Sequence, residues 1–289
     1  MSEPSGGRVV STAINKYVYV TMNRRFDDRI RISYSSMEEV DSVSRIQHGL
    51  VREAMRLTGI ESGVEITTIA DIPGRGTGLG SSSSVTVGLL NAMHSFQGRE
   101  PSKEQLAEEA CKIEIEIMGA PIGRQDQYAA SFGGINSISF GEGGVAVEPI
   151  EIENDLLSRV SRNFTLVFTG MTRSASKVLS EESEDELDKS NRMRVIREHA
   201  DKAAIMFQNG DLDSIGDLLN ETWNAKRGIS SLITNQSIDE LHGRVMSSGA
   251  KGAKLLGAGN GGFLLVYGGD GLRNTLQSEL GPGFRMFPL

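Results

Sequence analysis

Cysteine, net positive charge and long apolar runs are missing or scarce in this chain of 289 residues. The single cysteine, Cys111, excludes an internal disulfide and a zinc site built on several cysteines, and it fits a reducing cytoplasm. Its helix-like surroundings favour a small buried apolar side chain over a reactive thiol. Lys and Arg number 30 against 38 Asp and Glu, and the net charge of -8 argues against a nucleic-acid-binding protein.

Apolar runs are short throughout the chain. The run Phe263–Tyr267 is far below the roughly 20 residues of a membrane span, and residues 1–7 lack the apolar core of a signal peptide. We therefore expect a cytoplasmic protein that does not bind a membrane.

Glycine, by contrast, is abundant, with 34 residues in the chain, which exceeds the usual share of about 7%. Nine of them lie in residues 74–80 and 252–262. The surplus therefore indicates two loops whose backbone approaches a ligand closely, rather than general flexibility.

The spacing of apolar residues predicts an α+β chain in two lobes. The expected strands cover residues 8–22, 29–34, 64–70, 135–140, 145–150, 164–168, 254–256 and 263–267. The expected helices cover residues 43–57, 85–96, 103–118, 191–207, 212–223, 238–246 and 272–280.

Local signals add detail to these elements. Strand 29–34 is expected to pair with strand 8–22 across a turn. Asp41 or Ser42 is expected to cap the first helix, which would end at Gly59, and Ser102 to cap the third. The acidic residues 180–188 are expected to form a solvated loop or a frayed helix start.

The first glycine-rich loop, residues 73–84, lies between an expected strand and an amphipathic helix. Glycine at every second position from Gly74 to Gly80 lets the backbone bend, and the helix that follows presents N–H groups and the positive end of its dipole. This favours a phosphate site over a flexible connector. It is not a Walker A loop, because no lysine follows Gly80, and the serine hydroxyls at the helix start are suited to Mg²⁺.

The second loop, Gly257-Ala258-Gly259-Asn260-Gly261-Gly262, matches G-x-G-x-x-G but precedes a short apolar strand rather than a helix. This context excludes a dinucleotide fold, and the motifs of a protein kinase are missing as well. A tight turn between two strands is an equal alternative to a ligand loop.

Two acidic residues mark a third segment. Glu114 lies on an expected helix, and Asp126 follows the turn Gly119-Ala120-Pro121-Ile122-Gly123. One carboxylate can hold a metal while the other faces an acceptor hydroxyl. A solvated Glu114 and a helix-capping Asp126 are the alternatives.

Together the three segments resemble the GHMP kinases, the superfamily of galactokinase, homoserine kinase, mevalonate kinase and phosphomevalonate kinase. Residues 73–82 are similar to its P-x-x-x-G-L-G-S-S loop, and residues 254–262 to its third motif. Residues 11–17, 123–130 and 169–175 resemble the branch that includes D-glycero-D-manno-heptose 7-phosphate kinase.

The resemblance covers nearly the whole chain and implies a two-lobed fold. A lobe like domain 2 of ribosomal protein S5 would cover residues 1–155, and a ferredoxin-like lobe residues 156–289. In the heptose branch a Gly-Gly-Gly-Thr-Asp segment that helps to form the sugar site precedes the region similar to residues 6–10, whereas only five residues precede it here. We therefore expect a short N-terminus, an open sheet edge and an incomplete acceptor pocket.

The resemblance also implies the site residues. Ser82 and Glu114 would ligate Mg²⁺, and Asp126 would orient or deprotonate the acceptor hydroxyl. Thr172 and Arg173 are candidates for binding the sugar phosphate, with a surface arginine as the alternative. The strand residue Lys16 is a candidate for facing the substrate cleft, with an edge-strand lysine as the alternative. The ATP phosphates would be held by the backbone of Gly76, Thr77, Gly78, Leu79, Gly80, Ser81 and Ser82.

The expected function is an ATP- and Mg²⁺-dependent kinase that phosphorylates the anomeric hydroxyl of D-glycero-D-manno-heptose 7-phosphate to give the 1,7-bisphosphate. The alternatives are another sugar kinase of the superfamily, of the fucose or galactose type, and an inactive nucleotide- or sugar-binding remnant. ATP and a sugar phosphate are the expected partners, without nucleic acid or membrane, and a homodimer is left open.

Overall fold

A computed structural model describes residues 6–72, 76–172 and 186–289. The chain divides into two compact units. Unit 1 contains the described parts of Met1–Ile14, Arg75–Leu79 and Gly134–Leu289, and unit 2 contains those of Asn15–Gly74 and Gly80–Gly133. Both units combine helices with sheets, as expected for an α+β chain. The expected lobe boundary after residue 155 stays a prediction.

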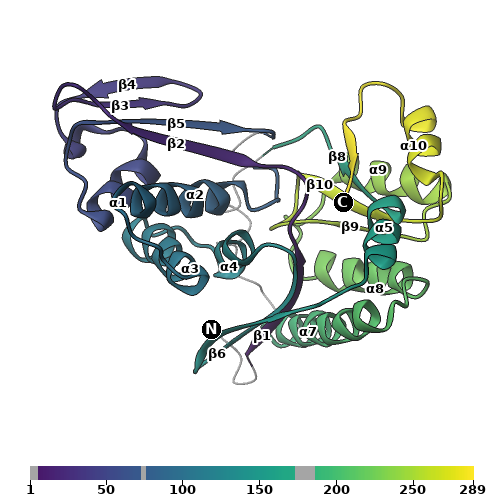
Figure 1. Cartoon of the computed structure of the whole chain (residues 1–289). Coiled ribbons are helices and arrows are strands. Elements are labelled where there is room, and N and C mark those ends of the chain that lie inside the picture. Colours follow the sequence, from purple (N-terminus) through teal and green to yellow (C-terminus); the bar gives the residue numbers. More distant parts are fainter. Residues whose placement is uncertain (1–5, 73–75, 173–185) are drawn as a thin grey trace. The chain divides into compact units, whose positions relative to one another are not determined.

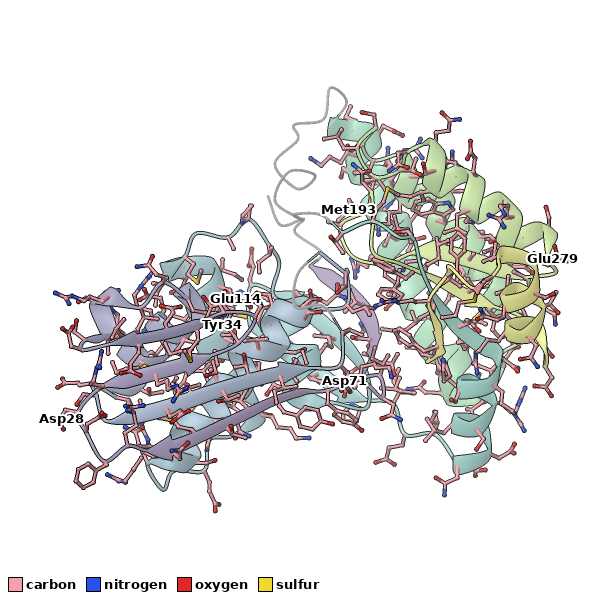
Figure 2. All side chains as sticks on the ribbon, turned by 90° about the horizontal axis from the view of Figure 1, so that it is seen from above. Asp28, Tyr34, Asp71, Glu114, Met193 and Glu279 are labelled. Carbon is pink, nitrogen blue, oxygen red and sulfur yellow. The ribbon has the colours of Figure 1, made fainter. Side chains whose placement is uncertain are left out.

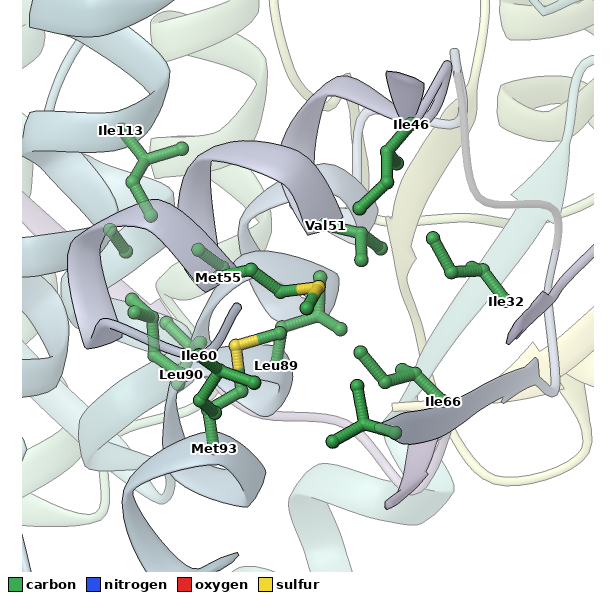
Figure 3. Close-up of a cluster of buried hydrophobic side chains, with 14 of the residues drawn as sticks. Ile32, Ile46, Val51, Met55, Ile60, Ile66, Leu89, Leu90, Met93 and Ile113 are labelled. Carbon is green, nitrogen blue, oxygen red and sulfur yellow. The ribbon is translucent and has the colours of Figure 1, made fainter. Parts of the chain in front are cut away.

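Unit 2 is built on one four-stranded sheet. Its strand order is β2 (Val18–Arg24), β5 (Val64–Ala70), β3 (Ile30–Ser33) and β4 (Met37–Val40). Helices α1 (Gly49–Thr58) and α2 (Ser81–Phe96) lie along one face of this sheet (Figure 1). Alternate strand residues point toward the helices, so the core joins Ile30, Ile32 and Ile66 of the sheet to Met55, Leu89, Leu90 and Met93 of the helices (Figure 3).

The rest of unit 2 carries the acidic segment. Helix α3 (Lys103–Cys111) begins after Ser102, whose Oγ accepts a hydrogen bond from the N–H of Gln105 at 3.1 Å, so this cap is confirmed. A π-helical turn (Lys112–Ile117) continues α3, and α4 (Gln125–Phe132) follows a connection. Cys111 is buried, and loss of hydration raises the pKa of its thiol to about 11, which confirms a small apolar role.

Unit 1 holds two antiparallel sheets. The first has the order β1 (Gly7–Thr12), β6 (Ile135–Gly141) and β7 (Gly144–Pro149). The second has the order β11 (Met286–Pro288), β8 (Phe164–Phe168), β10 (Phe263–Tyr267) and β9 (Gly252–Leu255). With α10 (Leu272–Leu280) between β10 and β11, this is the strand order of a ferredoxin-like βαββαβ unit, as expected.

Helices cover both faces of the second sheet. Residues of α9 (Gln236–Ser247) and α10 pack with Leu255 and Leu264 on one face. Residues of α5 (Asn154–Asn163), α7 (Glu186–Asn209) and α8 (Ile215–Arg227) pack with Phe164 and Tyr267 on the other. In the described ranges, no helix is both long and apolar enough to cross a membrane.

Several sequence predictions in the first third were wrong. The expected strand 8–22 is two strands, because β1 pairs with β6 while β2 pairs with β5 in the other unit's sheet. Lys16 therefore lies in the connection between them, exposed, and not on a strand. The strand near residues 29–34 pairs with β4 and β5 instead of β2.

The first helix was also misplaced at its start. It begins at Gly49, and the Nδ1 atom of His48 accepts a hydrogen bond from the N–H of Val51 at 3.4 Å, so neither Asp41 nor Ser42 caps it. Its end at Gly59, with a φ of 74°, is confirmed. Four elements were not expected, namely β4, α4, α5 and β11. Of the acidic residues 180–188, only the last three are described, and they begin α7.

Candidate active site

The first glycine-rich loop follows a left-handed path at alternate residues. Gly76, Gly78 and Gly80 have φ angles of 73°, 72° and 68°. A residue with a Cβ adopts this region at a cost of about 1–2 kcal/mol, so this path requires the alternating glycines. Helix α2 begins directly after Gly80, and no side chain of the described residues caps it. Its first turn therefore has the N–H groups and the dipole direction of an anion site.

The third motif supports this loop within unit 1. A Cβ atom added to Gly257 would lie 2.7 Å from the Cα atom of Gly78, and one added to Gly262 would overlap the carbonyl group of Thr77. The N–H of Gly262 donates a hydrogen bond to the carbonyl oxygen of Met171 at 2.9 Å. The motif is thus a tight connection between β9 and β10 whose backbone packs directly on the first glycine-rich loop.

In unit 2, Glu114 lies in the π-helical turn and is buried, with an exposed fraction of 2% (Figure 2). Its Oε1 atom accepts a hydrogen bond from Ser82 Oγ at 2.6 Å. Its Oε2 atom accepts one from Ser83 Oγ at 2.8 Å and one from Gln127 Nε2 at 2.7 Å. A buried carboxylate needs such donors to remain charged, and this one receives three. The alternative of a solvated Glu114 is therefore wrong.

Asp126 lies in the first turn of α4, and its side chain is exposed. A Cβ atom added to Gly80 would lie 3.3 Å from the Cβ and Cγ atoms of Asp126, so the end of the phosphate loop passes close to this carboxyl group. Surrounding protein atoms reduce the hydration of Asp126 and raise its pKa, and the negative charge of Glu114 adds to this effect. A nearby negative charge that raises the proton affinity of Asp126 also favours the binding of a cation close to its carboxyl group.

Comparisons with known proteins give the family. Residues 45–134 match the family model described as GHMP kinases N terminal domain. The chain carries a GHMP kinase N-terminal domain. It is accordingly a phosphotransferase with an alcohol group as acceptor.

The relatives of this chain include proteins named for sugar substrates. It is 29% identical over 280 residues to D-glycero-alpha-D-manno-heptose 7-phosphate kinase of Campylobacter jejuni, an alignment that covers 90% of this chain and 81% of that protein. It is 29% identical over 235 residues to the bifunctional fucokinase/GDP-fucose pyrophosphorylase of Arabidopsis thaliana, covering 76% of this chain but only 22% of the plant protein.

A solved structure described as a D-glycero-D-manno-heptose 1-phosphate kinase from Bacteroides thetaiotaomicron superposes with a TM-score of 0.80. The superposition covers 98% of this chain and 87% of that one, at 22% identity. At this identity the likeness concerns the fold, and it supports the GHMP kinase fold for the whole chain.

The residues of this site suit a magnesium ion that is shared with a nucleotide. The Ser82 hydroxyl and Glu114 Oε1 are 2.6 Å apart, and both are oxygen ligands of the kind that Mg²⁺ prefers. The described residues contain no group of three or more His, Cys, Asp or Glu side chains that could hold a metal by themselves. Mg²⁺ usually takes its remaining ligands from phosphates and water, so two protein ligands are sufficient.

Two of the predicted substrate residues are described, and they belong to different units. Lys16 belongs to unit 2, whereas Thr172 belongs to unit 1 and is exposed. Thr172 follows a segment anchored to the third motif, because Thr169 Oγ1 donates to the carbonyl oxygen of Gly262 at 2.9 Å. Arg173 lies outside the described residues. These three roles stay predictions.

Sequence reasoning missed Ser83 and Gln127, the two further partners of Glu114. Each stands next to a predicted site residue, Ser83 after Ser82 and Gln127 after Asp126. That adjacency was the only signal in the sequence. It could not show that both side chains reach the same carboxylate oxygen.

Proposed function

We propose that this sugar kinase of the GHMP type transfers the γ-phosphoryl group of ATP to the anomeric hydroxyl of D-glycero-D-manno-heptose 7-phosphate, giving the 1,7-bisphosphate. The observation that carries the proposal is the cluster in unit 2, where Ser82 bonds to buried Glu114 and Gly80 lies against Asp126. The heptose substrate is supported by the similarity to the Campylobacter jejuni enzyme over most of both chains.

Phosphoryl transfer depends mainly on positioning and on neutralising charge, and the site residues divide these tasks. The loop from Gly76 to Gly80 and the first turn of α2 would hold the nucleotide phosphates. Ser82 and Glu114 would hold Mg²⁺, which when bound neutralises phosphate charge. Asp126 would orient the anomeric hydroxyl and accept its proton, a task for which a raised pKa makes the carboxylate a stronger base.

The test is a coupled assay of ADP release with Mg²⁺, ATP and one acceptor at a time: D-glycero-D-manno-heptose 7-phosphate, fucose, galactose or mevalonate. The proposal predicts the highest kcat/KM with the heptose phosphate. A lack of turnover with the heptose phosphate would contradict it. Stabilisation of the fold by nucleotide without any turnover would instead support an inactive nucleotide-binding remnant.

A second candidate is the phosphorylation of an unphosphorylated sugar of the fucose type, because the fucokinase relative shows the same identity as the heptose kinase. Arg173 discriminates between the two. If the arginine binds a substrate phosphate, Arg173→Ala should raise the KM for the heptose phosphate sharply while the KM for ATP stays the same. An unchanged sugar KM would favour the unphosphorylated substrate.

A further inference from the structure

Gln127 is the completely buried neighbour of exposed Asp126 on α4, with an exposed fraction of 0%. Its Nε2 atom donates to Glu114 Oε2, while its Oε1 atom has no hydrogen-bond partner among the described residues. Leaving a buried acceptor unpaired costs free energy, about 1–3 kcal/mol. An apolar side chain of the same size would avoid this cost, so the amide at this position needs another explanation than packing.

The two oxygens of Glu114 have different surroundings. Oε2 receives hydrogen bonds from Ser83 and Gln127, both of which are buried. Oε1 receives one from Ser82, whose side chain is exposed. One oxygen is thus fixed by two interior donors, while the other faces the residue that would share the metal.

We propose that Gln127 is a positioning residue which, together with Ser83, holds Glu114 Oε2 so that only Oε1 is presented to the metal ion. The inference rests on the proposed function for the identity of that ion. A cation bound by Oε1 and the Ser82 oxygen would require the Ser82 hydroxyl proton to turn away, so Glu114 would lose this one donor. The two donors on Oε2 would remain and would keep the buried carboxylate in its orientation.

The same helix turn links the metal ligand to the acceptor side of the site. Asp126 points to water and Gln127 points into the core from consecutive positions of α4. The hydrogen bond from Gln127 to Glu114 therefore joins the metal ligand to α4 without involving the Asp126 side chain. A substitution of Gln127 should weaken metal binding most and sugar binding least.

The test uses Gln127→Met, which keeps a similar volume and removes the amide donor, with Mn²⁺ as the probe. Mn²⁺ is titrated by electron paramagnetic resonance into the full chain saturated with a non-hydrolysable ATP analogue. Partners that orient a metal ligand typically contribute 10- to 100-fold to metal affinity. We therefore expect the Mn²⁺ dissociation constant to rise by roughly ten-fold or more, and the Mg²⁺ concentration for half-maximal activity to rise with it while the sugar KM is unchanged.

Two further variants make the result interpretable. Gln125→Met places the same change on an exposed position of α4 and should leave Mn²⁺ binding as in the wild type. Ser83→Ala removes the other donor to Oε2 and should weaken Mn²⁺ binding, whereas Ser83→Thr keeps the hydroxyl and should restore it. The Ser83 pair decides the question if Gln127→Met fails to fold.

Folded Gln127→Met and Ser83→Ala proteins with wild-type Mn²⁺ affinity would overturn the inference and leave the proposed kinase function intact. Wild-type protein that binds no Mn²⁺ with the nucleotide analogue would overturn the inference and the metal assignment together. The Mn²⁺ titration contains no sugar, so its result does not depend on whether the proposed sugar substrate is correct.

Discussion

Asp126 is exposed to water, yet the surrounding protein and Glu114 raise the pKa of its carboxyl group. The acid stands where the phosphate loop ends, since Gly80 leaves room for it and any side chain at Gly80 would meet it. At the scale of single residues, proton transfer is the proposed role of Asp126, and metal binding is the proposed role of Ser82 and Glu114.

The activity of Asp126→Asn tests the first of these roles. The amide keeps the size of the side chain but cannot accept the hydroxyl proton, so kcat should fall by about 10²- to 10⁴-fold. The KM for ATP should change little. Steady-state kinetics with the preferred sugar measure both values, and a retained kcat would remove Asp126 from the mechanism.

The pH dependence of stability gives a second test of Asp126 in metal-free protein. Because its pKa is raised in the folded state, the protonated form is favoured by folding. This contribution is fully present below the unfolded pKa, near 3.8, and is lost as the pH rises through the folded pKa.

The amide of the Asp126→Asn variant does not ionise, so the variant does not lose this contribution to stability as the pH rises. The variant should therefore be more stable than the wild type at pH 7, by a margin that shrinks as the pH falls toward 4. Urea unfolding in the presence of EDTA at a series of pH values measures the margin. A margin that grows toward acid would show that the carboxylate is stabilised in the fold.

Some residues of the site could be predicted from the sequence, and others could not. The spacing and the family resemblance led to Ser82, Glu114 and Asp126, and the structure joins Ser82 to Glu114 directly. Ser83 and Gln127 were missed because their role depends on a shared oxygen atom, which lies 31 residues from Ser83 and 13 from Gln127 along the chain.

At the scale of elements, the third motif packs against the part of the first glycine-rich loop that belongs to unit 1. Gly257 and Gly262 allow the backbone of the third motif to pack on Gly78 and Thr77. The motif can therefore support the first glycine-rich loop without contacting a ligand. The phosphate loop owes its path to this support as well as to its own glycines.

Gly257→Ala tests the support. The added methyl group would collide with the Gly78 backbone and would also have an unfavourable positive φ of 62°. We expect a loss of stability above the ~1–2 kcal/mol of left-handed strain alone, and a several-fold higher KM for ATP.

Gly249→Ala is the matched control in the same unit. Gly249 has a φ of 98° but open space where its Cβ would lie, so it carries the strain without the collision. Denaturant unfolding and ATP kinetics compare the two variants. Equal effects on the KM for ATP would show that backbone contact between the two loops is unimportant.

Elements with strong local signals were predicted well, and elements defined by distant partners were not. Strand β5 and the end of α1 at Gly59 agree with their sequence patterns. Residues 8–22 are uniformly rich in strand-forming side chains, so nothing local divides β1 from β2. The division arises because β1 finds its partner in β6 and β2 finds its partner in β5.

At the scale of the whole molecule, the chain carries a GHMP kinase N-terminal domain, and each of its two units is assembled from segments far apart in sequence. Unit 2 carries Ser82, Glu114 and Asp126, and unit 1 carries the third motif and Thr172. The ferredoxin-like strand order of the second sheet was expected only through the family resemblance, since local patterns do not specify which strands become neighbours.

The most direct test of the central claim is a ³¹P NMR spectrum of the wild-type protein incubated with Mg²⁺, ATP and D-glycero-D-manno-heptose 7-phosphate. We expect the γ-phosphate signal of ATP to decay while a second sugar phosphate appears, coupled to the anomeric proton, and we expect Asp126→Asn to produce neither change in the same time. Intact ATP with this acceptor, or a new phosphate on another carbon, would contradict it.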